Sequence, residues 1–127
     1  MVAPTNPHDH RHLEAARGWL GLGDWQSASD ELEEITPAVR ATSGVLLVRV
    51  ENYLRAGRPE MAQPVAQTLA RACSSDWRAH YALAQTETQL RNFTAARTAL
   101  ERAFALRDIR HRALADPLRQ TLWGNLN

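Results

Sequence analysis

The sequence predicts an all-α fold, an α-solenoid of three antiparallel helix pairs with a short C-terminal capping helix. The first observation is an internal repeat: residues 23–28, 57–62 and 91–96 align at a spacing of 34 residues. The second is that apolar residues around these segments recur every three or four positions, which is typical of helices. The third is that 127 residues, 44% of them apolar, suit one compact domain.

The repeat sets the expected boundaries. We expect a disordered N-terminus over residues 1–6, because chain ends that nothing holds are poorly ordered, and a single domain over residues 7–127. Asn6-Pro7 is expected to open the first helix, because proline suits the first helical position. The repeats are expected at about 9–41, 43–75 and 77–108, with the cap over 109–127.

Each repeat is expected to hold two helices joined by a turn. In the second repeat, apolar stripes run through residues 45–54 and 61–73. Between them, Gly57 is typical of a helix end and Pro59 of a helix start. Pro64 then follows inside the second helix, where its ring and missing N–H predict a kink or an irregular turn between Glu60 and Pro64.

Polar and small residues mark the other expected features of the pairs. Ser43 and either Ser75 or Asp76 are natural N-caps for the second and third pairs. Alanine recurs where the two helices of a pair must approach closely, and a larger side chain would overpack there. These alanines are Ala28, Ala62 and Ala96.

A cap is expected because an open helical array leaves an apolar face on its last repeat. Asp116-Pro117 predicts the start of a further helix. Leu118, Leu122 and Trp123 would share one face of that helix and cover the last pair. Residues 109–115 are expected to connect the third pair to this cap.

The repeat resembles the tetratricopeptide repeat (TPR) family, whose pattern has a 34-residue period, W-x2-L-G-x2-Y in the first helix and A-x3-F in the second. The similarity covers roughly residues 8–107 and is strongest in the turn between helices and in the alanine step. Trp19 and Tyr53 stand at the first-helix Tyr position, whereas Glu87 replaces the aromatic in the third repeat. The chain also departs from the pattern at the Trp positions (His12, Leu46, His80), the Gly positions (Ala16, Val50, Ala84) and the Pro positions (Arg40, Ser74, Asp108).

The resemblance implies a binding surface, because TPR arrays bind along the concave face formed by the first helix of each pair. Mapped onto this chain, that face would carry His10, Leu13, Arg17, Leu47, Glu51, Arg55, Arg78, Tyr81 and Gln85. Its apolar row beside a polar row suits a helix or an extended peptide with alternating anchors. The alternative is that Leu13 and Leu47 are core residues within their repeats. A carboxylate clamp of the chaperone-binding type is not expected, since Arg78 alone is basic among its positions.

We therefore expect a protein–protein interaction scaffold that binds a peptide or helix of a partner protein, without catalysis. Two alternatives stay open: a secretion-type chaperone or adaptor that holds an unfolded client, and a module that self-assembles. Self-assembly is suggested by the charge distribution, because residues 1–64 carry six Arg and nine acidic residues whereas residues 65–127 carry nine Arg and five.

Other function classes find little support. The chain has no G-x-S-x-G, Walker, dinucleotide or H-E-x-x-H motif, so neither an enzyme nor a cofactor is expected. The single cysteine, Cys73, excludes an internal disulfide and a cysteine-based zinc site. His8 and His12 are one helical turn apart, but further ligands are missing and no metal is expected. A net charge of +1 and the lack of aromatics among the C-terminal arginines argue against nucleic acid.

Composition also suggests where the protein works. No apolar run approaches the eighteen residues of a membrane span, and the N-terminus lacks the features of a signal peptide. We therefore expect a cytoplasmic protein without membrane contact. All 15 basic residues are arginine, which together with abundant alanine indicates a GC-rich bacterial genome.

Overall fold

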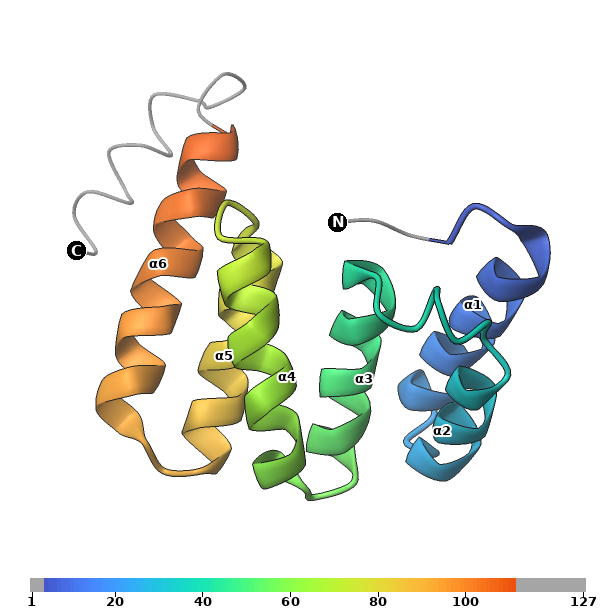
Figure 1. Ribbon diagram of the computed structural model, residues 1–127. Coiled ribbons are helices and arrows are strands. Elements are labelled where there is room, and N and C mark those ends of the chain that lie inside the picture. Colours follow the sequence, from blue (N-terminus) through green and yellow to red (C-terminus); the bar gives the residue numbers. More distant parts are fainter. Residues whose placement is uncertain (1–3, 112–127) are drawn as a thin grey trace.

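The computed structural model describes residues 4–111, with side chains as far as Asp108. Within that range the chain is all-helical and has no strand, which confirms the expected all-α class. The helices are α1 (Pro7–Gly21), α2 (Trp25–Glu33), α3 (Ser43–Arg55), α4 (Pro59–Ala72), α5 (Trp77–Gln89) and α6 (Phe93–His111). They stand in a row, with α1 and α2 at one end and α6 at the other (Figure 1).

Each helix packs against its neighbours in the chain, and the helices that open the expected repeats also meet. Helix α1 contacts α2 and α3, and α3 contacts α2, α4 and α5. Helix α5 in turn contacts α4 and α6. The core follows the same order, with one cluster around Leu13, Leu20 and Leu32 and a second around Val50 and Ala66. Within the array, α3 and α5 thus stand next to each other.

The three alanines that were expected at the close approach of the paired helices are buried. Ala28 and Ala62 have no exposed surface, and Ala96 is 7% exposed. Because so little of each alanine is exposed, a larger side chain at these positions would force the helices apart or adopt a strained rotamer.

Side chains cap three of the helix starts. Asn6, Asp24 and Asp76 each accept a hydrogen bond from a backbone N–H in the first turn of α1, α2 and α5. Asp76 is one of the two caps expected for the third pair. Helix α3 begins after Thr42, which has an extended backbone, so that Ser43 is the first helical residue and not the cap.

The same turn geometry joins the two helices of each of the three pairs. Gly23, Gly57 and Arg91 adopt left-handed backbones, with φ of 80°, 72° and 63°. The residue after each donates its N–H to the carbonyl five positions earlier, at 2.9 Å in every case: Asp24 to Trp19, Arg58 to Tyr53 and Asn92 to Glu87. The 34-residue repeat of the sequence is therefore also a repeat of backbone conformation. Only at Arg91 does a residue with a Cβ occupy the left-handed position.

Helix α4 continues through its internal proline. It is unbroken from Pro59 to Ala72, and Pro64 is exposed, which keeps the ring on the solvent side. The segment from Glu60 to Pro64, where we expected an irregular turn or kink, is thus helical throughout.

At the N-terminal end, the described residues belong to the fold from Pro4 onward. Pro4 is buried and Asn6 caps α1, although residues 1–6 were expected to be disordered as a whole. Residues 1–3 lie outside the described residues.

At the other end, α6 is longer than expected. It runs to His111, so residues 109–111, which we expected in the connection to the cap, extend the last helix. The reason is that neither glycine nor proline interrupts residues 93–111, which are rich in good helix formers. The capping helix expected around Leu118, Leu122 and Trp123 lies outside the described residues.

Candidate functional site

An open groove of about 670 Å³ crosses the neighbouring helices α3 and α5 and reaches the C-terminal half of α6. Its lining is a mixture of apolar and polar side chains. The apolar ones are Leu47, Val50, Leu54, Trp77, Tyr81, Ala82 and Phe104, and the polar ones are Glu51, Arg55, Arg78, Gln85, Gln89 and Arg107. Because α3 and α5 start the second and third repeats, residues one period apart face the same groove.

Most of the residues expected on the concave face meet in this groove. Six of the nine line it: Leu47, Glu51 and Arg55 from α3, and Arg78, Tyr81 and Gln85 from α5. On each helix these residues recur every three or four positions, as side chains on one helix face do. The resemblance to TPR arrays, mapped through the register of the repeat, thus indicated six residues that line one groove.

The three residues expected from α1 lie elsewhere. Leu13 has no exposed surface and belongs to the first core cluster, so the alternative interpretation, that it is a core residue, holds. His10 and Arg17 are exposed on α1 but do not line the groove, and Arg17 forms an ion pair with Glu14. The expectation that Leu13 is exposed on the binding face is therefore wrong, whereas a binding role for His10 and Arg17 stays a prediction. Leu13 is buried because α1 packs its Leu13 stripe into the core formed with α2 and α3.

Tyr81 is the exposed aromatic of the groove. The residue is 39% exposed. This exposed fraction is high for an aromatic core residue and suits an aromatic residue on a binding surface. Trp77 lies one helical turn earlier, and the two rings meet edge to face with centroids 6.2 Å apart and an interplanar angle of 67°. This contact fixes the orientation of Tyr81 without covering it.

Arg107 joins α6 to the same aromatic cluster. Its guanidinium carbon lies 5.7 Å from the centroid of Trp77 and 5.2 Å from that of Phe104. Both distances are within the range of cation–π attraction. Among the described residues, no carboxylate is within ion-pair distance of Arg107.

The other charges of the groove are partly satisfied. Arg78 pairs with Asp76 through two contacts, Nε to Oδ1 at 3.2 Å and Nη2 to Oδ2 at 3.3 Å. Burial raises the pKa of Asp76, but hydrogen bonds from the backbone and side chain of Arg78 outweigh it, so the pKa is lowered overall. Arg55 and Glu51 are 3.8 Å apart and half exposed, so their attraction is weak.

The histidine-rich start of α1 serves the fold. Asp9 is fully buried, and its Oδ1 accepts hydrogen bonds from the N–H of Thr36 at 2.9 Å and from its hydroxyl at 3.1 Å. These bonds, led by the backbone one, lower the pKa of Asp9. His12 Nδ1 lies 2.7 Å from Glu31 Oε2, which ties α1 to α2. Over the part of the chain that is described, no three His, Cys, Asp or Glu side chains are grouped to hold a metal ion.

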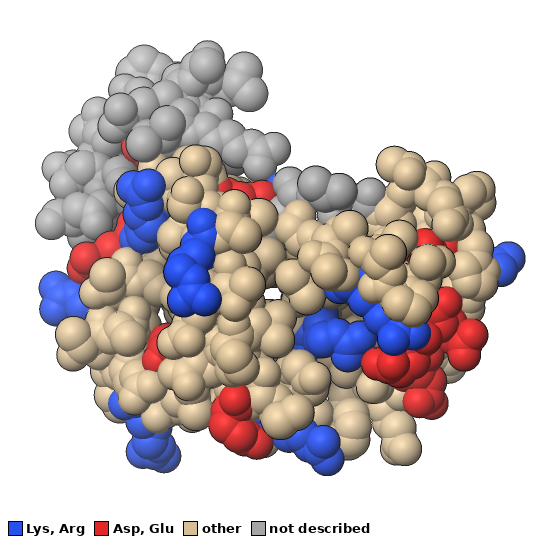
Figure 2. Space-filling view, viewed as in Figure 1, with Lys and Arg blue, Asp and Glu red and all other residues tan. Residues whose placement is uncertain are grey.

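Acidic side chains gather at the opposite end of the molecule from the groove. Figure 2 shows them over the end that contains α2, where Asp30, Glu33 and Glu34 are exposed. Glu33 is shared between Arg40, at 3.4 Å, and Arg49, at 3.3 Å.

Seven residues that line the groove were not among those expected, and three of the seven, Trp77, Phe104 and Arg107, carry an aromatic ring or a charge. Trp77 lies in the first turn of α5, and Phe104 and Arg107 belong to α6, the second helix of its pair. Their spacing carries a usable signal, because Trp77 and Tyr81 are four residues apart and Phe104 and Arg107 three, so each pair shares a helix face.

Two comparisons with known proteins found no match. No family model matches the chain, and no solved structure matches it. Within residues 4–111, no helix combines the length and the hydropathy that crossing a membrane requires. The groove itself is therefore the feature from which a function can be inferred.

Proposed function

We propose that this chain is a TPR-like solenoid that binds a peptide or a helix of a partner protein in the groove of α3, α5 and α6, without catalysis. The observation that carries the proposal is Tyr81. It is an aromatic side chain, 39% exposed, held by Trp77 inside an open groove with an apolar floor. Aromatic side chains in such positions dominate the binding energy of many protein interfaces.

The solenoid part of the proposal is supported by the recurrence of structure at the sequence period. The same left-handed turn closes the pairs at Gly23, Gly57 and Arg91. The contacts of α1 with α3 and of α3 with α5 are those expected when successive pairs stack. Such stacking places the first helices side by side and so creates a surface for an elongated partner.

Binding would combine two kinds of contact. Leu47, Leu54 and Tyr81 offer apolar surface for side chains of the partner, which supplies affinity. Glu51 and Gln85, on facing helices, offer hydrogen bonds that set the register of a bound segment. The floor under them is firm, because Val50 and Ala82 belong to the second core cluster.

The test is affinity capture from a native lysate with three forms of the protein: wild type, Tyr81→Ala and Phe93→Ala. Phe93 is the matched control, since it is an aromatic residue 63% exposed at the start of α6, outside the groove. A groove partner is retained by wild type and Phe93→Ala and lost by Tyr81→Ala. Capture that is the same with all three forms would contradict the proposal.

Self-assembly is a second candidate because acidic side chains gather over α2 whereas arginines line the groove. If copies associate through these charges, the molar mass measured by light scattering exceeds that of a monomer at low salt. Raising the salt concentration would then return it to the monomer value, because exposed charges are screened. A monomer at both salt concentrations would exclude this mode of association.

A further inference from the structure

The charges that line the groove are predominantly positive. They comprise the guanidinium groups of Arg55, Arg78 and Arg107 and a single carboxylate, that of Glu51. Arg55 and Glu51 lie 3.8 Å apart and offset each other. Arg78 is likewise paired with Asp76, at 3.2 Å. Arg107 therefore determines the potential at the end of the groove where α5 begins and α6 approaches its C-terminus.

Arg107 is held in place by aromatic rings. The faces of Trp77 and Phe104 lie 5.7 and 5.2 Å from its guanidinium carbon. Cation–π attraction does not use up the N–H donors of a guanidinium, which can also bind a carboxylate. A guanidinium held in this way has lost part of its side-chain freedom, so a carboxylate that binds it pays less in ordering.

Resting on the proposed function, we infer that the partner is an acidic protein segment with an apolar anchor. A carboxylate of the segment binds the N–H donors of Arg107, which lines the groove. The apolar anchor packs on Tyr81 and on the aliphatic floor at Leu47 and Leu54. Charge complementarity selects the class of partner, and apolar contact supplies most of the affinity.

A protein segment fits these observations better than a nucleic acid does. Single-stranded nucleic acids bind where bases stack on free aromatic faces along a track of cations. Here Arg107 lies over Trp77 and Phe104, so that Tyr81 is the one strongly exposed ring among the described groove residues, and Leu47 and Leu54 add aliphatic lining. The aliphatic side chains and the carboxylate of Glu51 that line the groove suit the apolar and polar side chains of a peptide.

The experiment is a selection of random twelve-residue peptides displayed on phage, carried out against the wild-type protein and against Tyr81→Ala. Peptides enriched by the wild type alone are groove binders. The inference predicts that these peptides share Asp or Glu flanking a large apolar residue. A groove-binding set with neutral or basic consensus would overturn the acidic partner and leave the proposed function standing. Failure to enrich any peptide that depends on Tyr81 would overturn both.

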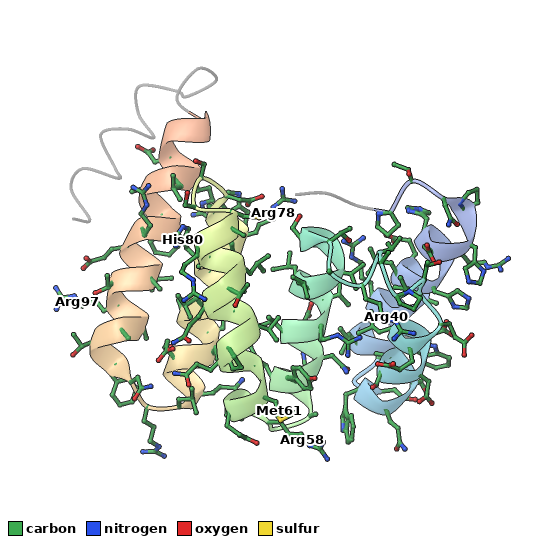
Figure 3. All side chains as sticks on the ribbon, viewed as in Figure 1. Arg40, Arg58, Met61, Arg78, His80 and Arg97 are labelled. Carbon is green, nitrogen blue, oxygen red and sulfur yellow. The ribbon has the colours of Figure 1, made fainter. Side chains whose placement is uncertain are left out.

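The best synthetic peptide is then titrated against Arg107→Gln and Arg97→Gln. Arg97 is the matched control, since it lies on the same helix and points away from the other helices (Figure 3). Arg107→Gln is expected to weaken binding about tenfold or more, as for loss of one partner of a partly desolvated charge pair, and Arg97→Gln less than about twofold. Equal effects of the two variants would contradict the role of Arg107. Tighter groove binding of a fluorescent oligothymidylate than of the peptide would contradict a protein partner.

Discussion

The Oε1 atom of Glu87 on α5 accepts a hydrogen bond of 3.0 Å from Nε2 of Gln63 on α4. Its other carboxylate oxygen accepts one of 2.8 Å from Nδ2 of Asn92, in the turn before α6. Glu87 is only 3% exposed, so these two donors compensate for the burial of a carboxylate. One side chain thus links α4, α5 and the turn that carries Arg91.

Replacing Glu87 by alanine is expected to lower the free energy of unfolding by about 2 kcal/mol, because it removes two hydrogen bonds to a charged group and strands their donors. Glu101→Ala is the control. Glu101 forms an exposed ion pair with Arg97, at 3.0 Å, and its loss should cost less than about 0.5 kcal/mol. Urea denaturation of both variants measures the difference. Equal losses would show that Glu87 does not hold these elements together.

Arg91 offers a test in the stabilising direction. Its φ of 63° is left-handed, a conformation that glycine adopts at the two equivalent turns. Arg91→Gly should raise the free energy of unfolding by about 1 kcal/mol, the penalty of a Cβ in this region, and so raise the melting temperature by a few degrees. Arg91→Ala separates conformation from charge, because it keeps the Cβ and should give no such gain. A lower melting temperature for Arg91→Gly would contradict the turn assignment.

The buried Asp9 predicts a dependence of stability on pH. The pKa of Asp9 in the folded state lies below the usual value of an aspartate, because hydrogen bonds from Thr36, led by the backbone one, favour the carboxylate. Its contribution to stability is therefore complete above the unfolded pKa and is lost as the pH falls through the folded pKa. Melting curves between pH 7 and about pH 2 should show that Asp9→Asn removes part of this acid sensitivity.

Asp30→Asn is the control for that experiment, since Asp30 is exposed on α2. It should melt with the same pH dependence as the wild type. A pH dependence of Asp9→Asn that is indistinguishable from both would show that the bond between Asp9 and Thr36 is not linked to folding.

Two leucines one period apart separate core from groove. Leu13 is fully buried, whereas Leu47 is half-buried and lines the groove. Leu13→Ala should cost about 2–5 kcal/mol of stability, as in other buried cores. Leu47→Ala should cost clearly less and should weaken peptide binding, which chemical denaturation and titration would measure. A Leu47→Ala loss as large as that of Leu13→Ala would place Leu47 in the core.

The sequence predicted the features that repeat and missed those that occur once. Period and turn residues located the helices, and the same register placed Leu47 and Tyr81 in one groove. Leu13 shares that register yet is buried, because α1 lies at the end of the row and packs into the core with α2. Arg107 was missed as a groove residue because its place there depends on α6 leaning against the start of α5. The spacing of Phe104 and Arg107 places both on one face of α6, but it does not show that this face meets the start of α5.

Binding by Tyr81 is the central claim, and the most direct test is to measure the Kd of the captured partner and the melting curve for wild type and Tyr81→Ala together. We predict that Kd rises by about 30-fold, equivalent to about 2 kcal/mol for a hot-spot aromatic, while the melting temperature stays unchanged. An unchanged Kd would contradict binding in the groove. A melting curve that collapses, as expected when an aromatic core residue is truncated at a cost of about 3–5 kcal/mol, would show that Tyr81 holds the helices together instead.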